Sequence, residues 1–341
     1  MTHRFPIKEI ALQAGLGTAT VDRVLNDRPN VSPQTRQRVH AAIAELKGQE
    51  TQLSARGRRL FIDFVVEAPN RFTDEIKRAA ESILPTLGAG VFRPRFIFQE
   101  VMTEDDVLAI LRRIGKRGSH GVCLKARDLP RICDAVNALT AAGIPVVTLA
   151  TDIPNSSRTA YVGLDNANAG RTAAYLMTKF LGGQAGTVLT TKSQHAFFGE
   201  EERDSGFREV MKRDCPDVEL IDASGGAGVP WHMTKHVTKM VFGVKDLKGV
   251  YSMGGGNKAI LQILADQGHR PQVFIAHDLD KENKRLLEQG VLTFVLYHDL
   301  RADIRNAFLA FAQHHRLMQL DETPHVSDIQ IVTPFNPPHF S

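Results

Sequence analysis

The sequence contains little of what membrane proteins, secreted proteins and metal sites need. Only three of its 341 residues are cysteines, and Cys123, Cys133 and Cys215 are widely spaced with no CxxC pair. This pattern favours buried free thiols over a disulfide framework or a zinc site. No apolar run approaches a membrane span in length, and the N-terminus has neither a continuous apolar stretch nor a small-residue cleavage site. We therefore expect a cytoplasmic protein with no membrane partner.

Signatures of catalysis and of cofactor binding are also missing. The glycine run at 254–256 follows a predicted strand but lacks the GK[ST] of a nucleotide loop and the GxGxxG spacing. His232 and His236 are four residues apart, with no glutamate between them and no third ligand in view. No Ser, His and Asp grouping has the strand-elbow context of a nucleophile. The sequence thus predicts no metal, no cofactor and no enzyme.

Charge is distributed unevenly along the chain. Residues 1–60 contain ten Lys and Arg against five Asp and Glu, a net charge of +5, whereas the rest of the chain has a net charge of −1. The overall balance of 43% hydrophobic and 23% charged residues is that of a globular protein. A small basic segment on a nearly neutral body predicts a polyanion as the partner of that segment alone.

Apolar residues at helical spacing predict three short helices within the first 46 residues. The first stripe ends at Gly15, and the third follows Ser32 and Pro33, an N-cap and a first-turn proline. Helices of about eight residues are marginal alone, so the three must bury their stripes against one another. The stripes consist of Ile7, Ile10, Ala11 and Ala14, of Val21, Val24 and Leu25, and of Val39, Ala42, Ile43 and Leu46.

The connection between the first two helices has the length of a helix-turn-helix corner. Residues 15–17, Gly-Leu-Gly, allow the positive φ that such a corner needs. The second helix presents short side chains and one long cation, Arg23, which matches the two acceptors on a guanine edge. A helical protein-docking domain with a merely solvated Arg23 is the alternative. Four residues near the third helix suit phosphate oxygens: Ser32, Thr35, Arg36 and Arg38.

The rest of the chain alternates short apolar runs with amphipathic helical stretches. This order predicts parallel sheets covered by helices on both faces, and the length suits two such sheets. The predicted strands are 60–66, 96–98, 121–124, 145–149, 187–190, 249–253, 273–276 and 293–297, and the helical stretches between and after them include 104–114, 167–181, 258–267 and 301–315.

The basic segment resembles the DNA-binding head of the lac repressor family over residues 6–46, which read PIKEIALQAGLGTATVDRVLNDRPNVSPQTRQRVHAAIAEL. The resemblance implies that Thr18, Ala19 and Arg23 face bases in the major groove. It also implies that three polar residues contact the DNA backbone, and Thr20, which falls on the family motif, completes the expected DNA-binding set. The three backbone contacts are Asn26, Ser32 and Thr35.

Three positions depart from the family pattern. Gly17 stands where the family has a serine that caps the recognition helix, and Pro6 replaces a threonine or serine before the first helix. Asp22 places a carboxylate beside the groove, where phosphate repels it unless Arg23 or a cytosine amino group compensates. The operator preference of the family therefore does not transfer to this chain.

Residues 49–59 are expected to form a hinge. The family has a short hinge helix here, whose leucine wedges into the minor groove of the operator centre. This chain reads KGQETQLSARGRRL after Leu46, so Leu53 is the best remaining wedge and Arg56 is expected to grip the backbone or a narrow minor groove. We expect a hinge that folds only on DNA, and a plain basic linker is the alternative.

The body resembles the effector domain of the same family and the related periplasmic sugar-binding proteins. The most specific segment is 161–177, YVGLDNANAGRTAAYLM. The expected architecture is an all-α helix-turn-helix head with a two-lobed α/β body of the type I periplasmic-binding-protein kind. The expected parts are a head at 1–48, the hinge at 49–59 and a body at 60–341, with lobe N at 60–163 and 297–327, lobe C at 164–296 and 328–341, and a ligand in the cleft between the lobes.

Candidate ligand contacts follow from the rule that open parallel sheets bind at the C-terminal ends of their strands. By motif position, the resemblance assigns Arg203, Asn257 and Asp278 as polar contacts. Such groups, with an aromatic face over a ring, suit a small carbohydrate or polyol. Further candidates, for each of which an ordinary exposed loop residue is the alternative, are Asn70, Phe72, Arg127, Asp128, Asp152, Trp231 and His298.

Together these features predict a ligand-responsive transcriptional regulator, which by the family's usual mode is a repressor. We expect a homodimer on a near-palindromic operator of double-stranded DNA, with pairing of dimers into a tetramer left open. One alternative is a sugar-binding module without a DNA-binding role. Another is an enzyme that uses the carboxylates of Asp128, Asp152 and Asp278 on a glycoside.

Overall fold

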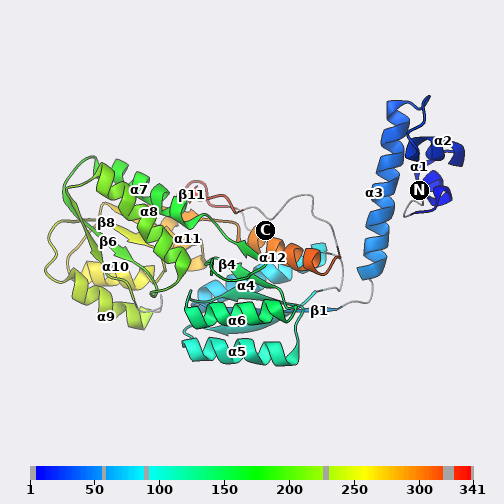
Figure 1. The fold of residues 1–341 in the computed structure, drawn as a ribbon. Coiled ribbons are helices and arrows are strands. Elements are labelled where there is room, and N and C mark those ends of the chain that lie inside the picture. Colours follow the sequence, from blue (N-terminus) through cyan, green and yellow to red (C-terminus); the bar gives the residue numbers. More distant parts are fainter. Residues whose placement is uncertain (1–4, 56–58, 88–91, 226–229, 318–325, 339–341) are drawn as a thin grey trace. The chain divides into compact units, whose positions relative to one another are not determined.

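The computed structural model describes residues 5–55, 59–87, 92–225, 230–317 and 326–338, with no description of the side chains of 47–55, 230–233, 235 and 236. The chain divides into two compact units, one of residues 1–59 with 312–321 and the other of residues 60–311 with 322–341. The helical head lies in the first, and the second is an α/β body made of two lobes (Figure 1). Both parts of the predicted fold class are therefore confirmed.

Three helices form the head, as the apolar stripes predict. They are α1 (Ile7–Ala14), α2 (Thr18–Leu25) and α3 (Pro33–Ala55). One residue from each stripe, Ile10, Val21 and Val39, is fully shielded from solvent at their common centre, and Phe5 closes the same cluster. Short helices gain their stability from this mutual burial.

The corner between α1 and α2 explains Gly15 and gives Arg38 a role that the sequence did not suggest. Gly15 ends α1 in the left-handed conformation, with φ at 61°. The Arg38 guanidinium crosses this turn and donates to the backbone oxygen of Ala14 at 2.8 Å. In the structure Arg38 closes the last turn of α1, and its contact with DNA phosphate stays a prediction.

Helix α3 extends beyond the predicted head. It continues without a break through Ala55, so residues 49–55 of the expected hinge are helical in the structure. This segment has no proline, and its neighbour Gly48 costs a helix only about 1 kcal/mol relative to alanine. A hinge that folds only on DNA stays a prediction. The wedge assigned to Leu53 and the grip assigned to Arg56 lie outside the described side chains.

Lobe N is built on a parallel sheet of five strands. Helices α5 (Glu104–Arg117) and α6 (Pro130–Ala141) cover one face, and α4 (Asn70–Ile83) and α12 (Leu300–His314) cover the other (Figure 1). The one-turn helix η1 (Leu84–Leu87) extends α4. In the order in which they pair, the strands are β2 (Phe92–Gln99), β1 (Leu60–Glu67), β3 (Gly121–Lys125), β4 (Val146–Leu149) and β5 (Ala160–Val162).

Lobe C repeats this plan with six strands. Its two faces carry separate apolar clusters, one under α7 and α8 and one under α9, α10 and α11. The strand order is β11 (Gln330–Val332), β10 (Phe294–Tyr297), β9 (Val273–His277), β8 (Leu247–Ser252), β6 (Gly186–Thr191) and β7 (Val218–Asp222), with only β11 antiparallel. The helices are α7 (Asn166–Leu181), α8 (Phe198–Asp214), α9 (Pro230–Val241), α10 (Asn257–Asp266) and α11 (Lys281–Glu288).

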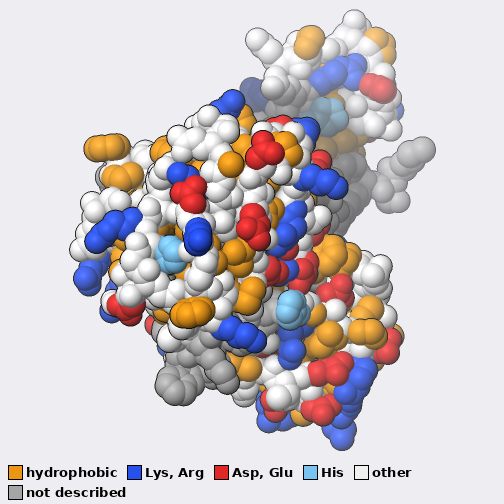
Figure 2. All heavy atoms as spheres, turned by 90° about the vertical axis from the view of Figure 1, so that its left-hand side faces the viewer, with side chains coloured by type: hydrophobic (Ala, Val, Ile, Leu, Met, Phe, Trp, Pro, Cys, Tyr) orange, Lys and Arg blue, Asp and Glu red, His pale blue; other side chains and the backbone are white. Residues whose placement is uncertain are grey.

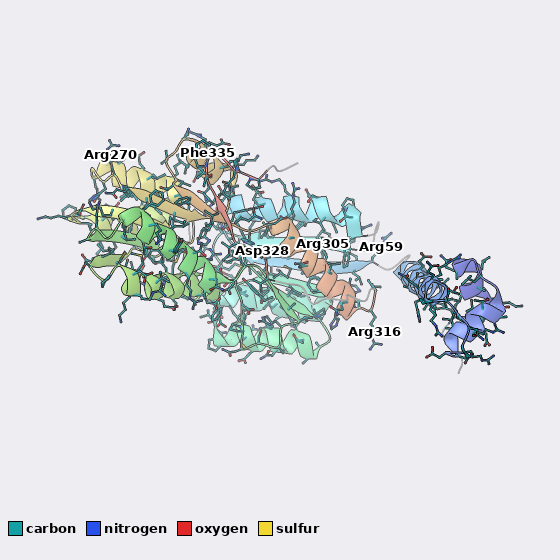
Figure 3. The ribbon with its side chains drawn as sticks, turned by 90° about the horizontal axis from the view of Figure 1, so that it is seen from above. Arg59, Arg270, Arg305, Arg316, Asp328 and Phe335 are labelled. Atoms are coloured by element: carbon teal, nitrogen blue, oxygen red, sulfur yellow. The ribbon has the colours of Figure 1, made fainter. Side chains whose placement is uncertain are left out.

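The chain passes between the lobes at three places that lie together. The first follows β5 at 163–165, the second follows β10 at 298–299, and the third precedes β11 at 326–329. The first and third are joined directly, because Ser327 donates its N–H to the oxygen of Gly163 at 2.8 Å. Figure 3 shows Asp328 at this junction between the lobes.

A close helix crossing in lobe C explains Gly170, which lies in the specific segment 161–177, and Gly206. A Cβ at Gly170 of α7 would lie 2.0 Å from the backbone oxygen of Arg203, and a Cβ at Gly206 of α8 would lie 2.2 Å from that of Ala167. The α7 and α8 backbones therefore approach each other as only glycine allows. This contact fixes the position of α8, and therefore the backbone position from which the Arg203 side chain extends.

Replacing Gly170 by alanine should destabilise the body. The added methyl group meets a backbone atom rather than a flexible side chain, so the helices must move apart, at a cost of about 1–3 kcal/mol. Urea unfolding of the variant measures this loss. Gly115→Ala in α5 is the matched control, because its Cβ would meet Leu139 at an ordinary 3.4 Å. Equal stability of the two variants would contradict the crossing.

Candidate functional site

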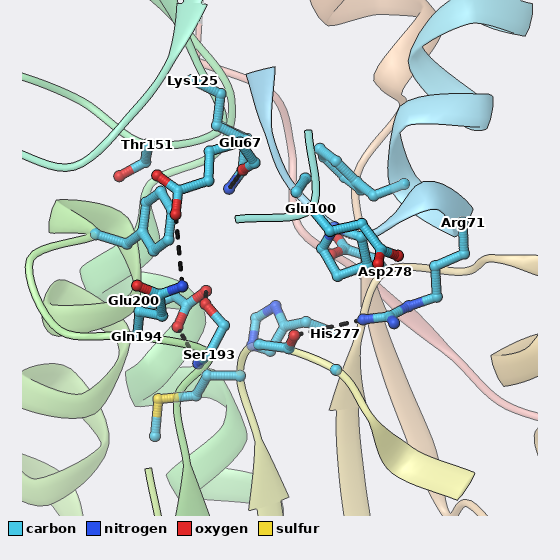
Figure 4. Close-up of a pocket in the computed structure, with 18 of the residues that line it drawn as sticks. Glu67, Arg71, Glu100, Lys125, Thr151, Ser193, Gln194, Glu200, His277 and Asp278 are labelled. Atoms are coloured by element: carbon cyan, nitrogen blue, oxygen red, sulfur yellow. Dashed lines mark hydrogen bonds between the residues drawn. The ribbon is translucent and has the colours of Figure 1, made fainter. Parts of the chain in front are cut away.

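The candidate ligand site is a pocket between the two lobes, at the C-terminal ends of their strands. Lobe N supplies residues from the ends of β1, β3 and β4, and lobe C supplies residues from the ends of β6, β8 and β9. This is where open parallel sheets bind ligands. Figure 4 shows Glu67, Lys125 and Arg71 of lobe N facing Ser193, Gln194 and His277 of lobe C.

Arg203 forms the polar base of the pocket. Its side chain is 5% exposed, and its Nε donates to Asn166 Oδ1 at 2.7 Å while Nη1 donates to the Met253 oxygen at 2.9 Å. These bonds hold the guanidinium in one orientation. A planar group fixed in this way can donate two parallel hydrogen bonds to adjacent oxygens of a ligand.

His277 adds an unpartnered nitrogen to the pocket wall. Its Nε2 lies 2.8 Å from the hydroxyl of Tyr251, and its Nδ1 is buried with no hydrogen-bond partner among the described residues. Burial, and then the Arg203 charge, hold the pKa of His277 well below its usual value. The imidazole is therefore neutral near pH 7, and Nδ1 can bond a ligand hydroxyl.

The half-buried Lys125 and the buried Glu67 form a polar pair on the lobe N side. Lys125 Nζ donates to the backbone oxygen of Glu67 at 3.1 Å and lies 4.0 Å from the centre of the Phe197 ring. Burial lowers the pKa of Lys125 and raises the pKa of the Glu67 carboxyl, which is 1% exposed. Arg127 opposes the second shift from behind, with its Nε 3.5 Å from Glu67 Oε2.

Several contacts join the lobes around the pocket. Arg71 from α4 reaches lobe C, where its Nε lies 3.0 Å from Asp280 Oδ2. Gly255, with φ at 84°, makes room for that guanidinium, because a Cβ there would lie 1.8 Å from Arg71 Nη2. Gln194 of lobe C donates to Glu67 of lobe N at 3.4 Å (Figure 4). These contacts link the position of one lobe to the other.

Three of the predicted ligand residues line the pocket, and six do not. Phe72, Arg203 and Asp278 border the cavity. Asn70 begins α4, where its N–H donates to Glu100, and Arg127 lies behind Glu67. The other four that lie outside the lining are Asp128, Asp152, Asn257 and His298, and the side chain of Trp231 in α9 lies outside the described residues.

The residues outside the lining have structural partners. Asp152 forms an ion pair with Arg158, and Asn257 donates to Asn283 at 2.7 Å. His298 lies between the pocket and the crossovers, with its Nδ1 2.6 Å from Asp303 and its Nε2 3.8 Å from the pocket residue Asp278. These side chains have partners within the protein, and their roles as ligand contacts stay predictions.

His298, Asp303 and Ser327 form a buried polar cluster where the lobes join. The hydroxyl of Ser327, in the third crossover, donates to Asp303 of α12. Burial alone would lower the pKa of His298, but the Asp303 carboxylate, with a smaller contribution from Asp278, raises it. The serine bonds the aspartate instead of the histidine, so this cluster does not have the order of a nucleophilic triad.

The head presents the predicted base-reading residues on one exposed helix. Thr18, Ala19 and Arg23 of α2 are exposed, and Thr20 is half-buried. Arg23 has no ion-pair partner among the described residues. The Asp22 carboxylate is compensated from within the head, by Arg28 at 3.1 Å and by Asn26 Nδ2 at 2.8 Å. Arg23 therefore does not need to neutralise Asp22.

Three predicted backbone contacts also serve the local fold. Asn26 donates to the Asp22 oxygen at 2.9 Å as α2 ends. Ser32 accepts the N–H of Thr35 at 3.1 Å, the N-cap that the sequence predicts for α3, and its hydroxyl lies 2.8 Å from that of Thr35. Arg36 pairs with Asp27. Gly17, as expected, begins α2 without a capping side chain.

Other kinds of site are missing from the described part of the chain. There, no group of three His, Cys, Asp and Glu side chains could hold a metal ion. The described helices include none with the length and apolar character needed to cross a bilayer. His232 and His236 have side chains outside the described set.

The fold and the site together define a class: a helix-turn-helix head joined to a two-lobed body with a binding cleft between its lobes. The chain belongs to the family whose model is described as "Periplasmic binding protein domain", which matches residues 64–314. Residues 6–47 match the model described as "Bacterial regulatory proteins, lacI family". The resemblances of the head and of the body are both confirmed.

Individual relatives agree with this assignment. The HTH-type transcriptional regulator TreR of Salmonella typhimurium is 32% identical over 126 residues, which are 36% of this chain and 39% of TreR. The glucose-galactose binding protein GanP of Geobacillus stearothermophilus has a TM-score of 0.72 at 18% identity, over 83% of this chain and 100% of GanP. A candidate LacI transcriptional regulator of Bacteroides fragilis has a TM-score of 0.72 at 16% identity, over 82% and 98% of the two chains. The two solved structures establish the shared fold.

Proposed function

We propose that this chain is a transcriptional regulator that binds double-stranded DNA through its head and a small carbohydrate or polyol in the cleft of its body. One observation supports the proposal: a single chain contains both a lacI-family head and a body with a pocket that both lobes line. In the head, Arg23 is exposed and has no ion-pair partner among the described residues. A protein that reads DNA acts where DNA is, so we place it in the cytoplasm.

The pocket chemistry favours an uncharged ligand over a phosphorylated one. Five carboxylates line it against three cations, and two of those cations, Arg71 and Arg203, are already bonded within the protein. Excess acceptors suit hydroxyl donors and repel phosphate. GanP is a glucose-galactose binding protein, and a similar binding protein from Burkholderia graminis is solved in complex with D-arabinose. The five carboxylates are Glu67, Glu100, Glu200, Asp278 and Asp280.

A ligand can act on the DNA only through its preference for one arrangement of the lobes. Some hydrogen bonds between the lobes form only when the lobes are together. The Gly199 N–H donates to Thr151 Oγ1 at 2.9 Å, and the Asp128 N–H donates to the Ala196 oxygen at 2.7 Å. A ligand that stabilises these contacts changes the relation between the paired hinges of a homodimer. Repression relieved by the ligand is the sign that we propose.

The test uses the full chain. Selection from a random duplex library should enrich a near-palindromic site, and thermal shift against sugars, polyols and sugar phosphates should identify neutral ligands. Sedimentation should give a dimer. Absence of any enriched DNA, together with a stabilising sugar, would favour the binding module without a DNA role.

Replacing Arg23 by alanine should reduce base discrimination by about 1–3 kcal/mol, because the guanidinium is the long donor on the exposed face of α2. The quantity to measure is the ratio of affinities for the selected duplex and for random duplex. Arg28→Ala is the control, since Arg28 is engaged with Asp22. A ratio equal to the parent's in Arg23→Ala would show that α2 is not the recognition helix.

The glycosidase alternative loses its geometric basis. Of the three carboxylates that it needs, Asp278 lines the pocket, whereas Asp152 pairs with Arg158 and Asp128 lies outside the lining. Paired carboxylates must flank one bond. We therefore propose that the protein binds its ligand without turnover, and unchanged sugar recovered after prolonged incubation is the expected result.

A further inference from the structure

A strongly basic surface lies on lobe N, away from the pocket. It combines the last two turns of α5 with the first half of β2, and we name it the α5 basic face. Four of its side chains are exposed and border one shallow depression together with Ala109. The face consists of Arg93, Arg95, Arg112, Arg113, Lys116 and Arg117.

The positive charge of the α5 basic face is largely uncompensated. Asp63 is the one carboxylate that pairs with it among the described residues, and it is fully buried between Arg95 at 2.6 Å and Arg117 at 2.7 Å. None of the described residues forms an ion pair with Arg112, Arg113 or Lys116. Cations in the last turn complement a helix dipole, but the excess here is more than that effect needs.

The sheet register explains how these residues come together. Asp63 and Arg95 pair in β1 and β2, and the next pair along the same face, Val65 with Ile97, is covered by α5. Because α5 runs antiparallel to the strands, its C-terminal turn lies at the end of the sheet where the strands begin. The α5 basic face therefore lies at the N-terminal end of the lobe N strands.

The segment that connects the head to the body enters the sheet at this same end, at the start of β1. Helix α3 ends at Ala55 and β1 begins at Leu60, so four residues connect the DNA-binding head to the first strand of this sheet. DNA bound by the head is thus held at a high local concentration near the start of β1. On the face of the molecule seen in Figure 2, by contrast, Lys and Arg are interspersed with Asp and Glu.

We propose that the α5 basic face binds phosphates of duplex DNA that flanks the site read by the head. Exposed arginine and lysine side chains without carboxylate partners suit a backbone contact that is independent of sequence. The contact adds affinity and salt dependence, and leaves base discrimination to α2. The proposal rests on the proposed function, because it requires the head to hold DNA.

The test compares two duplexes in binding to the full chain. One is the shortest selected duplex that retains full discrimination by Arg23, and the other is the same core with arms of about 20 base pairs, two helical turns, on each side. The variant Arg112→Gln/Arg113→Gln/Lys116→Gln should lose roughly tenfold or more in affinity for the long duplex only. Its salt slope on that duplex should fall by about 2–3, at about 0.9 per phosphate contact.

A matched control removes the same charge from lobe C. Lys212, Lys239 and Arg270 are exposed, without ion-pair partners among the described residues, and Figure 3 shows Arg270 at the end of lobe C away from lobe N. Their replacement by glutamine should leave both duplexes bound as before. Equal affinities and salt slopes of the α5 variant and the parent on the long duplex would overturn the inference. Failure of the parent to bind any selected duplex would instead overturn the proposed function.

Discussion

Replacing Arg203 by methionine should remove the ligand response and leave DNA binding intact. The guanidinium is buried at the base of the pocket, fixed by Asn166 and the Met253 oxygen, with its remaining donors available to ligand oxygens. Loss of a buried charged donor of this kind costs about 2–5 kcal/mol, roughly thirtyfold or more in ligand affinity. Calorimetry with the sugar identified by thermal shift measures the change.

The control for this prediction lies on the neighbouring helix. Arg171 of α7 is exposed and pairs with Glu209 at 3.0 Å on the surface, so Arg171→Met should change ligand affinity little. Urea unfolding of the Arg203 variant shows whether its body is folded. A folded variant that binds the sugar as tightly as the parent would remove Arg203 from the site.

Replacing Asp303 by alanine should lower the free energy of unfolding by about 3–5 kcal/mol, because a buried charged group loses its partner. Asp303 is fully buried and contacts both His298 and Ser327 where the lobes join. Urea unfolding at several pH values measures the loss. Asp299→Ala, which removes an exposed bond to the Arg301 N–H, should cost only about 1 kcal/mol.

The stability lost on replacing Asp303 should depend on pH. The pKa of His298 is raised in the folded state, so its protonation stabilises the fold below the unfolded value of 6.5. This contribution is lost as the pH rises through the raised pKa. The penalty of Asp303→Ala should therefore be larger at pH 6 than in alkaline solution. A penalty that does not change with pH would contradict the charged pair.

Most of the fold was predictable because buried strands carry continuous apolar runs. All eight predicted strands are present. Three strands were missed, β5, β7 and β11, and each lies at the edge of its sheet. Each of these three strands is only partly buried, as the exposed Glu219 in β7 illustrates, and is too short or too polar to stand out as an apolar run. Pairing with a neighbour, which no local pattern encodes, makes them strands.

The site was predicted less completely, for a reason visible in three residues. Glu67, Lys125 and His277 are the last residues of β1, β3 and β9, and all three line the pocket. The rule that polar groups follow each strand selected Arg127 instead of Lys125. The useful signal was a polar residue that ends an apolar run. The contact of Arg71 with Asp280 was not accessible in this way, because it joins residues of different lobes.

A reciprocal titration measures whether the cleft and the head are coupled. Operator affinity is measured with and without saturating sugar, and sugar affinity is measured with and without saturating operator, on the full chain. Thermodynamic linkage requires the same factor in both directions, and we expect roughly 5-fold to 150-fold. A sugar that binds the body tightly while operator affinity stays unchanged at saturation would contradict the account.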